Sequence, residues 1–264
     1  MARAVAMSDG MQVADVLARI PGWCGARVEL LHGGLSNRTY LVSKDDARAV
    51  LKIDDEPRAA PLNSRQSEAR IQSAAAAKGL AGNVLYFDDS CLLTEYVEGR
   101  AWRAEDLRDE ARLQQLGQRL RQLHSLPLSG RTFDASDAAR LYLRTIKSDD
   151  TEQLERCVHI IDSMPAPMNL SLCHNDLVVG NLIDAGQIMF IDWEYACDND
   201  PFFDLATVAA HHDLGEAQLH VVLRSYFDGD WHRWSSQLQR QIEHYEALLW
   251  LWNEARATSC CGAP

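Results

Sequence analysis

The chain has 264 residues, of which 47% are hydrophobic and 24% charged, and its formal net charge is -12. This composition is ordinary for a globular protein with a sizeable core, and the negative charge disfavours nucleic acid or an acidic membrane surface as a partner. We see no apolar stretch long enough to cross a bilayer and no apolar run of a secretory signal, so we expect a cytoplasmic protein with no membrane partner. The seven cysteines show no zinc-type spacing and are expected to be free thiols.

The first third of the chain alternates short β-type segments with turns and contains two helical segments. Pro57 and Pro61 mark a loop, Asn63 is a candidate N-cap for the longer helix, and Gly79 is its stop signal. The predicted elements are a helix over 11–19, strands over Arg27–Leu31, Thr39–Ser43 and Ala49–Ile53, a helix up to Lys78, and strands over Val84–Phe87 and Leu92–Val97.

The rest of the chain is mainly helical in pattern. Leucines at 113, 116, 120 and 123 recur at helical spacing in the first of these segments. The predicted helices are Glu105–Leu126, Ser136–Lys147, Thr151–Ser163, Asp204–Asp213, Glu216–Phe227 and Ser235–Ala257. We therefore predict an α+β protein with a β-rich N-terminal lobe over residues 1–97 and an α-rich C-terminal lobe over residues 98–264.

The segment from His174 to Asp192 carries the chemistry. His174 is followed by Asp176 and Asn181, and two short apolar runs flank a turn before Asp192, which predicts a hairpin. The ends of a hairpin are adjacent, so Asn181 and Asp192 should converge as oxygen ligands for Mg²⁺. Asp176 would orient and deprotonate an attacking hydroxyl, which is what phosphoryl transfer from ATP requires of a carboxylate. The alternative is a surface hairpin that happens to be rich in Asp and Asn.

Three features of the N-terminal lobe fit the same reaction. Gly33, Gly34, Ser36 and Asn37 lie in a turn between two strands, where backbone N–H groups can approach phosphates, although a plain hairpin turn is the commoner interpretation. Lys52 lies in the middle of a predicted strand, and taken alone it would be a lysine that faces solvent. Glu68 lies in the first turns of a predicted helix, and taken alone it would only interact favourably with the helix dipole. In this order, they match the ion pair that positions ATP phosphates.

These residues resemble the aminoglycoside phosphotransferase/choline kinase superfamily, which has a protein-kinase-like two-lobed fold. The resemblance extends from Gly33 to about Trp252. The matching pieces are Gly-Gly-Leu-Ser-Asn37, Lys52, Arg65-Gln-Ser-Glu68, Leu93-Thr-Glu-Tyr-Val-Glu-Gly99, Leu120-Arg-Gln-Leu-His-Ser125, His174-Asn-Asp176, Ile191-Asp-Trp-Glu-Tyr-Ala196 and Asn199-Asp-Pro-Phe-Phe-Asp-Leu-Ala206.

The resemblance implies a role for each matched position. Lys52 paired with Glu68 would hold ATP phosphates, and Glu95, Tyr96 and Val97 would form the hinge that meets adenine. Asp176 would be the catalytic base, and Asn181 and Asp192 the Mg²⁺ ligands. Asp204 would hydrogen-bond the catalytic loop, and His124 would be a packing residue.

The acceptor is expected to be a small cationic or amine-bearing molecule, bound by aromatic and polar side chains near the base. The candidates are Trp193, Glu194, His211, Tyr245 and Trp250. Choline or a related amino alcohol is favoured, with thiamine or an aminoglycoside-like sugar as alternatives. Two departures bear on choline. His211 stands where choline and thiamine kinases carry an acid. Trp250 and Trp252 are two residues apart on a predicted helix, so their side chains point to different faces and do not easily line one pocket together.

Two other classes of protein remain as rivals. A pseudokinase that only binds ligands would be expected to lack one of Lys52, Asp176, Asn181 or Asp192, and all four are present. A protein kinase needs an activation loop, for which the short segment between Asp192 and Asp204 leaves little room. The sequence leaves the oligomeric state open.

Overall fold

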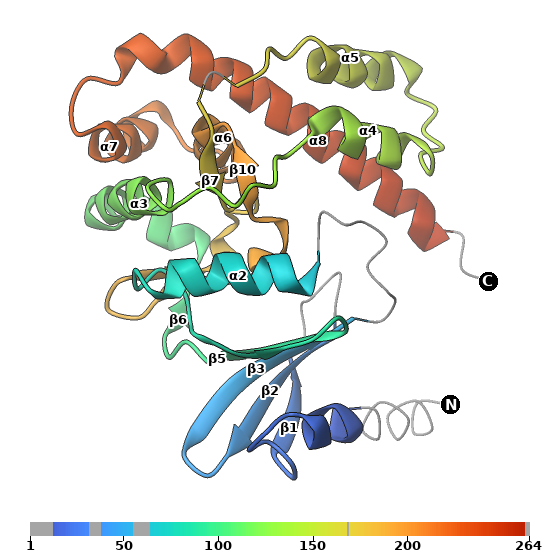
Figure 1. Cartoon of the computed structure of the whole chain (residues 1–264). Helices are drawn as coiled ribbons and strands as arrows, with labels where there is room; N and C mark the ends of the chain where they lie inside the picture. The colour runs from blue at the N-terminus through green and yellow to red at the C-terminus, as the bar shows by residue number, and fades with distance from the viewer. Residues whose placement is uncertain (1–12, 32–37, 55–63, 168, 262–264) are drawn as a thin grey trace. The chain divides into compact units, whose positions relative to one another are not determined.

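The computed structural model describes residues 13–31, 38–54, 64–167 and 169–261 (Figure 1). The chain divides into two compact units, Met1–Gly99 and Arg100–Pro264. The first unit contains an antiparallel sheet and helices, and the second is mainly helical, so the predicted α+β class is confirmed. The functions assigned to the two lobes remain predictions.

A five-stranded sheet in the order β1-β2-β3-β5-β4 forms the frame of the first unit. Its strands are β1 (Arg27–Leu31), β2 (Arg38–Lys44), β3 (Ala47–Ile53), β4 (Val84–Phe87) and β5 (Cys91–Glu95). Tyr40, Val42 and Leu51 are buried on one face and form a core with apolar residues of a helix over 13–19. The register aligns Thr39, Lys52 and Leu92 across three strands on the opposite face. Lys52 therefore lies on the face away from this core.

Helix α2 (Arg65–Ala76) follows β3 in sequence. Its N-cap is Ser64, whose hydroxyl accepts the backbone N–H of Ser67 at 3.2 Å. The predicted cap, Asn63, lies outside the described residues, and the observed cap is one residue later. The helix ends before Gly79, which has a positive φ of 65° and so follows the predicted stop.

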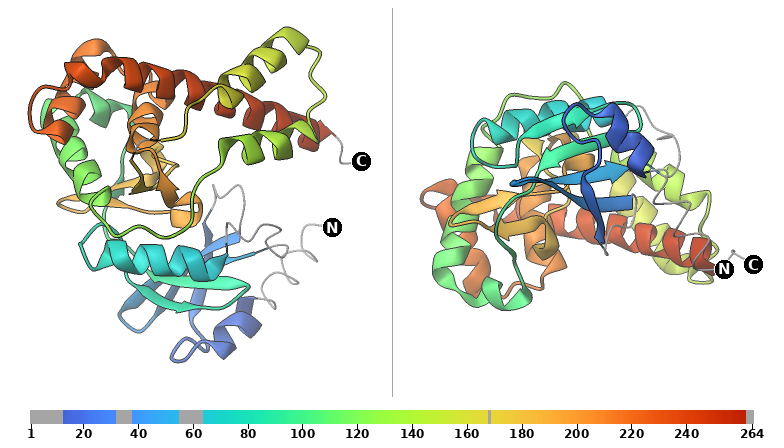
Figure 2. Two further views of the ribbon diagram at one scale, coloured as in Figure 1. Left: turned by 45° about the horizontal axis from the view of Figure 1, so that its top comes forward. Right: turned by 90° about the horizontal axis from the view of Figure 1, so that it is seen from below.

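The second unit is built on a long helix. In Figures 1 and 2, α6, α5 and α4 lie along α8, while α3 packs against α7. The helices are α3 (Glu110–Leu123), α4 (Ala135–Leu143), α5 (Thr151–Asp162), α6 (Pro201–His211), α7 (Glu216–Phe227) and α8 (Ser235–Cys261). A side chain at Gly117 of α3 would collide with Val222 and Ser225 of α7, so glycine permits this close packing. No helix in the described part of the chain combines the length and apolarity of a membrane span.

Two small sheets complete the second unit. One contains β6 (Arg100–Ala101), β8 (Leu182–Asp184) and β9 (Ile188–Phe190) in the order β6-β8-β9, and the other pairs β7 (Ser171–Cys173) with β10 (Cys197–Asn199). The sequence predicts the β8–β9 hairpin, which is confirmed by the pairing of Leu182 with Phe190. It misses β6, β7 and β10, because strands of two or three residues are too short to show a period.

Several predicted helix boundaries are wrong, and the caps explain why. The helix predicted from Glu105 is a 3-10 turn over Ala104–Arg108, followed by α3, because the carboxylate of Asp109 caps the N–H groups of Ala111 and Arg112. The helix predicted from Asp204 begins at Pro201, with Asp200 as its cap and proline in the first turn.

Candidate active site

The loop that carries the predicted base begins where β7 ends. Residues 174–177 form this Asp176 loop, and Asn175 has a left-handed backbone with φ of 64°, which asparagine tolerates better than most residues. The carboxylate of Asp204, in α6, accepts the backbone N–H groups of His174 at 2.9 Å and of Asn175 at 2.8 Å. The prediction that Asp204 hydrogen-bonds this loop is confirmed. Asp176 directly follows the two residues that Asp204 fixes.

The side chain of Asn175 holds the loop from the other side. Its amide nitrogen donates to the carbonyl oxygen of Tyr195 at 3.0 Å, and its amide oxygen accepts from Asn199 at 2.8 Å. The sequence suggested no separate role for Asn175, because these partners are 20 and 24 residues away. The position before Asp176 is therefore constrained through both its backbone and its side chain.

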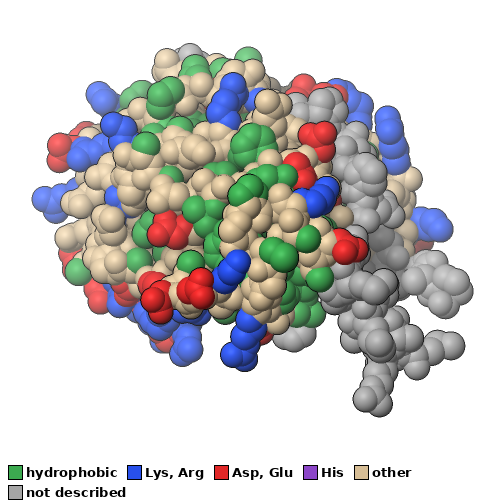
Figure 3. All heavy atoms as spheres, turned by 60° about the horizontal axis from the view of Figure 1, so that its bottom comes forward, with side chains coloured by type: hydrophobic (Ala, Val, Ile, Leu, Met, Phe, Trp, Pro, Cys, Tyr) green, Lys and Arg blue, Asp and Glu red, His purple; other side chains and the backbone are tan. Residues whose placement is uncertain are grey.

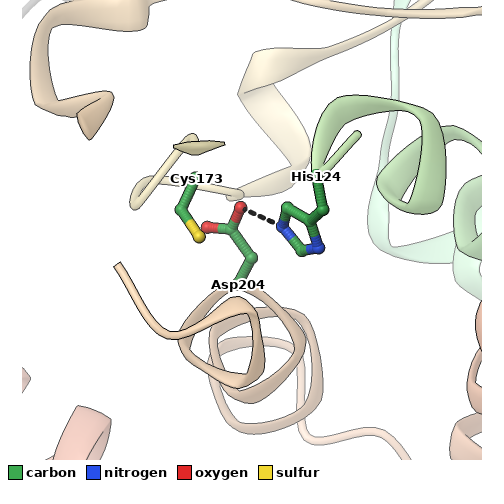
Figure 4. A group of neighbouring side chains, drawn as sticks. All are labelled: His124, Cys173 and Asp204. Carbon is green, nitrogen blue, oxygen red and sulfur yellow. Dashed lines mark hydrogen bonds and ion pairs between the residues drawn. The ribbon is translucent and has the colours of Figure 1, made fainter. Parts of the chain in front are cut away.

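Beneath the loop lies a buried cluster of His124, Cys173 and Asp204, whose candidate ligand atoms lie within 4.8 Å of one another (Figure 4). The Nε2–H of His124 donates to Asp204 at 3.0 Å, and its Nδ1 lies 2.8 Å from the hydroxyl of Tyr226. Burial raises the pKa of the Cys173 thiol well above its ordinary value, which disfavours a metal-binding thiolate. Because Asp204 already accepts three hydrogen bonds, we interpret this cluster as structural; His124 is a hydrogen-bonding residue as well as the predicted packing residue.

His174 connects the Asp176 loop to the end of the β8–β9 hairpin. Its ring is fully buried and lies 4.9 Å from that of Trp193, measured between ring centres. Its Nε2 lies 3.0 Å from the carbonyl oxygen of Ile191, and because a carbonyl only accepts, Nε2 carries the proton. The residue after Ile191 is Asp192, so His174 ties the base-bearing loop to the predicted metal ligand.

Asn181 and Asp192 meet at the open end of the hairpin. The backbone N–H of Ile191 donates to the carbonyl oxygen of Asn181 at 3.0 Å, which confirms the predicted convergence. Asp192 has φ of 65° and ψ of 67°, an unusual conformation for a residue with a side chain. Such strain is typical of positions that surrounding structure holds for a function.

Helix α3 anchors the hairpin. The guanidinium of Arg119 donates to the carbonyl oxygen of Ile188 at 2.8 Å, and that of Arg112 donates to Asp184 at 2.7 Å. Arg119 is only 7% exposed. These long-range contacts, which the sequence did not indicate, fix both strands of the hairpin that presents Asp192.

The predicted base lies against the amide of Asn181. The Nδ2 of Asn181 donates to the Asp176 carboxylate at 2.9 Å and to the Asp176 carbonyl oxygen at 2.8 Å. Burial raises the pKa of the Asp176 carboxyl, and the charge of Asp192 raises it further, while His174, His211 and the Asn181 hydrogen bond act in the opposite direction. A raised pKa makes Asp176 a better proton acceptor than an ordinary surface aspartate.

The donor set at this site fits a hard divalent cation. The amide nitrogen of Asn181 is directed at Asp176, which leaves its amide oxygen as the ligand atom, and Asp192 contributes carboxylate oxygens. Amide and carboxylate oxygens are typical Mg²⁺ ligands. Asn181 and Asp192 are therefore the residues that would hold the ion.

A buried network of four charged side chains lies in the first unit. Lys52 Nζ lies 3.2 Å from one oxygen of Glu68, and Arg65 donates to the other oxygen at 2.7 Å. Arg65 also makes a two-pronged contact with Asp54, at 2.6 and 3.2 Å. The structure therefore brings the predicted Lys52–Glu68 pair together and adds Arg65 and Asp54, for which the only sequence signal was the Arg65-x-x-Glu68 spacing.

The predicted adenine hinge follows β5. The N–H of Tyr96 donates to the carbonyl oxygen of Arg48 at 3.1 Å, and the Arg48 guanidinium carbon lies 4.1 Å from the centre of the Tyr96 ring. A side chain at Gly82 would lie 2.7 Å from the carbonyl oxygen of Glu95, so glycine is needed beside the hinge. The Tyr96 N–H is thus already used within the sheet, and the adenine-binding role of Glu95, Tyr96 and Val97 remains a prediction. Four predicted phosphate-binding residues lie outside the described part of the chain: Gly33, Gly34, Ser36 and Asn37.

The structure separates the predicted acceptor residues. Trp193 is fully buried and donates to the carbonyl oxygen of Phe190 at 3.1 Å, and Glu194 is 7% exposed. Trp250 lines a cavity of about 320 Å³ on α5 and α8, together with Glu243 and Glu246. On α8, this cavity-lining face differs from the face of Tyr245, which lies 2.9 Å from the Nδ1 of His211 on α6.

The arrangement within the two units is that of a kinase-like phosphotransferase. The model of the phosphotransferase enzyme family (APH) matches residues 27–236, and the chain belongs to this family. Its members and structural neighbours include small-molecule kinases and antibiotic phosphotransferases, so the suspected resemblance is confirmed.

Sequence relatives include the protein LicA of Haemophilus influenzae, 26% identical over 85% of this chain and 72% of the relative. Thiamine kinase of Salmonella paratyphi B is 28% identical over 70% of this chain and 67% of the relative. Among solved structures, choline kinase LicA from Streptococcus pneumoniae has a TM-score of 0.77 at 20% identity, covering 96% of this chain and 93% of that one. A choline/ethanolamine kinase family protein from Mesorhizobium loti has a TM-score of 0.75 at 22% identity, covering 97% and 88%.

Proposed function

We propose that this protein transfers the γ-phosphoryl group of ATP to a hydroxyl group of a small amine-bearing molecule. The observation that carries the proposal is the contact between the Asp176 carboxylate and Asn181 at 2.9 Å, next to the hairpin end that presents Asp192. One carboxylate for the acceptor and two oxygen ligands for a metal are what this reaction needs from a protein.

Asp176 is the proposed base. Its carboxylate accepts a hydrogen bond from the acceptor hydroxyl, orients that oxygen toward the γ-phosphorus and takes its proton as the new bond forms. Asn181 and Asp192 are the proposed Mg²⁺ ligands, and Mg²⁺ when bound neutralises charge on the phosphate oxygens. Asp204, Asn175 and His174 act by holding the Asp176 loop in place.

Lys52 is the proposed contact to the ATP phosphates. Glu68 holds its ammonium group at 3.2 Å, and the turn with Gly33, Gly34, Ser36 and Asn37 would supply backbone N–H groups to the same phosphates. Glu95, Tyr96 and Val97 are proposed to meet adenine. These assignments come from the match of the chain to its family and from the geometry of the Lys52–Glu68 pair.

Choline or a related amino alcohol, such as ethanolamine, is the first candidate acceptor. The structural neighbours include a choline kinase and a choline/ethanolamine kinase family protein, and one LicA structure contains AMP. Thiamine follows, because thiamine kinases match 70% of the chain. An aminoglycoside or aminosugar is the third candidate, since an aminoglycoside-3'-phosphotransferase shares the fold, with a TM-score of 0.64.

The replacement Asp176→Asn tests the mechanism. We expect kcat to fall by about 10³-fold, because general-base catalysis is lost, while the affinity for ATP changes little. Product formation is measured with purified enzyme, and ATP binding by thermal shift with and without Mg²⁺. Asp149→Asn, at an exposed position, is the charge-matched control. Near-normal turnover by Asp176→Asn would exclude Asp176 as the base.

An acceptor screen tests the substrate class. ATP consumption is measured with choline, ethanolamine, thiamine, aminosugars and aminoglycosides, and with uncharged sugars of similar size. We expect one amine-bearing class to be phosphorylated. Activity with uncharged sugars alone would contradict an amine-bearing acceptor, and absence of both turnover and a Mg²⁺-dependent nucleotide shift would indicate a binding module instead of an enzyme.

A further inference from the structure

The last turn of α6 lies against the Asp176 loop. The Nε2 of His212 lies 3.2 Å from the carbonyl oxygen of Leu177, and since a carbonyl only accepts, His212 is the donor. Leu177 directly follows Asp176. The neighbouring ring of His211 lies 5.0 Å from that of His212, measured between ring centres. His211, the residue before His212, therefore lies at the end of α6 that contacts the loop.

Tyr245 holds the ring of His211 in one orientation. The Tyr245 hydroxyl lies 2.9 Å from Nδ1 of His211, and the Tyr245 side chain is buried edge-to-face against Phe203, at 5.8 Å between ring centres. Tyr245 is 8% exposed, whereas His211 is exposed. A buried partner therefore fixes one ring nitrogen, and Nε2 is the nitrogen that remains for a ligand.

The Asp176 carboxylate is near enough to His211 and Tyr245 for electrostatic interaction with both. When His211 is protonated, its charge lowers the pKa of Asp176 against the larger effect of burial. Burial and the charge of Asp176 raise the pKa of the Tyr245 phenol, which therefore keeps its proton. A protonated phenol can donate a hydrogen bond to Nδ1 or accept one from it. If the phenol donates, Nε2 of the neutral imidazole carries the proton and is a donor; if the phenol accepts, Nε2 is an acceptor.

The chemistry of Nε2 discriminates between amines. A neutral imidazole offers one hydrogen bond and no opposite charge. A primary ammonium group has N–H groups that can donate a hydrogen bond to Nε2. A trimethylammonium group has no N–H and forms no hydrogen bond there. A site built to hydrogen-bond a group rejects the analogue that lacks it, because the polar atom then stays unpaired.

We propose that His211, oriented by Tyr245, binds the amino group of the acceptor through a hydrogen bond, so that the enzyme favours a primary amino alcohol over its N-trimethyl analogue. The inference rests on the proposed phosphotransfer function and sharpens its substrate class. His211 is the specificity-determining residue, and Tyr245 is a positioning residue that acts through it.

The test compares ethanolamine with choline at pH 8.5, where imidazole side chains are uncharged, in the full-length protein. The measured quantity is the ratio of kcat/KM for ethanolamine to kcat/KM for choline. We expect a ratio above one in the wild-type protein and a fall of about tenfold in His211→Leu, the equivalent of one hydrogen bond to a charged group. His211→Gln should retain part of the ratio, because its amide can still bond.

Two further variants separate positioning from general damage. Tyr245→Phe keeps the buried ring but loses the hydroxyl that fixes Nδ1, so the ratio should lie between those of the wild-type protein and His211→Leu. His159→Leu, at an exposed position of α5, is the matched control and should keep the wild-type ratio. The KM for ATP is measured in each variant and should stay within about twofold of wild type, because the lost contact belongs to the acceptor.

The outcomes distinguish the two proposals. A wild-type preference for choline, or a ratio within twofold of wild type in His211→Leu, would overturn the role of His211 while leaving the phosphotransfer function in place. If the wild-type protein phosphorylates neither ethanolamine nor choline, the role of His211 is overturned. If it phosphorylates none of the amines in the acceptor screen, the proposed function is overturned as well.

Discussion

At the scale of single residues, His244 is an uncompensated polar group in the helical unit. It is 6% exposed, its ring packs edge-to-face on Phe203, and its Nδ1 lies 3.3 Å from the side-chain oxygen of Gln241. Among the described residues its Nε2 has no hydrogen-bond partner. Burial lowers the pKa of His244 to about 4, from an ordinary 6.5.

This pKa predicts a loss of stability in mild acid. The unfolded chain takes up a proton at His244 as the pH falls below 6.5, whereas the folded chain does so only near 4. The folded state should therefore be destabilised progressively between these two values, by at most about 3 kcal/mol from this group. Urea unfolding at pH 7.5 and pH 4.5 measures the difference.

The replacement His244→Leu isolates the contribution of this residue. Leucine removes the titrating group and the unpartnered nitrogen, but it also removes the Nδ1 contact to the buried side chain of Gln241. The two effects oppose each other at pH 7.5, so the variant should be close to wild type in stability there and should lose less stability at pH 4.5. His159→Leu, an exposed histidine on α5, should keep the wild-type pH dependence. An equal acid-induced loss in His244→Leu and wild type would show that other groups cause it.

Sequence spacing located the residues of the Asp176 loop, and the family resemblance predicted one of its supports, Asp204, but the contacts of Asn175 and His212 were not predicted. Asp176, Asn181 and Asp192 fall within one short segment, so a hairpin prediction was enough to bring Asn181 and Asp192 together. The contact between His211 and Tyr245 joins residues 34 positions apart. No local pattern encodes such a contact, because it depends on how α6 packs against α8.

At the scale of elements, α6 holds the Asp176 loop from both of its ends. Asp204, near its start, accepts the N–H groups of His174 and Asn175, and His212, just after its end, donates to Leu177. Asp176 lies between these anchors. One rigid helix therefore sets the position of the proposed base, which explains why a helix without reacting groups would matter to the reaction.

The replacement Asp204→Asn should damage activity and stability together. An amide has one accepting oxygen, so one backbone N–H of the loop would face an NH₂ group, at a cost of about 2 kcal/mol. We expect kcat to fall at least tenfold with a smaller change in the KM for ATP, and the melting temperature to drop. Asp213→Asn, at an exposed position beyond the same helix, is the control. Wild-type kcat in folded Asp204→Asn would exclude this positioning role.

Helix α2 and strand β3 are joined by charge as well as by packing. Arg65 and Lys52 share the two oxygens of Glu68, and the side chains of Arg65 and Glu68 are 0% and 1% exposed. Arg65 and Lys52 therefore hold the Glu68 carboxylate from two sides. This arrangement would keep Glu68 in place beside Lys52, the proposed contact to the ATP phosphates.

The replacement Arg65→Lys tests this shared pairing. A lysine cannot contact Asp54 and Glu68 in the two-pronged manner of a guanidinium, so Glu68 should be held less firmly and the KM for ATP should rise several-fold. Lys78→Met, at an exposed position after α2, is the control. Arg65→Met would remove the guanidinium that pairs with both Asp54 and Glu68 and should destabilise the fold by about 3 kcal/mol, measured by urea unfolding. An unchanged KM for ATP in Arg65→Lys would assign Arg65 to stability alone.

Helices were predictable as elements, while their ends and the shortest strands were not. All six helices from α3 to α8 overlap their predicted ranges, although α6 is buried on every side over residues 202–209. Their starts depend on capping residues such as Asp109 and Asp200, of which the sequence offers several neighbouring choices. The strands β7 and β10 exist because their partners are brought together by the rest of the unit.

At the scale of the whole molecule, the chain has a formal net charge of -12. On the face shown in Figure 3, acidic and basic side chains alternate with hydrophobic ones and form no large patch of one sign. An attraction for a cationic acceptor would therefore come from the summed field and from groups near Asp176, and not from a concentrated acidic surface on that face. Summed fields act over long distances and are weakened by salt.

This field predicts a salt dependence that differs between acceptors. Raising the salt from about 0.01 M to about 1 M shortens the screening length from about 30 Å to about 3 Å. With ATP saturating, kcat/KM for ethanolamine should fall several-fold, because steering of the cation is lost. An uncharged diol of similar size, ethylene glycol, is the reference, and its lower kcat/KM should change little. Equal salt effects on both acceptors would mean that the protein's charge does not attract the substrate, and that recognition depends on contacts near Asp176 alone.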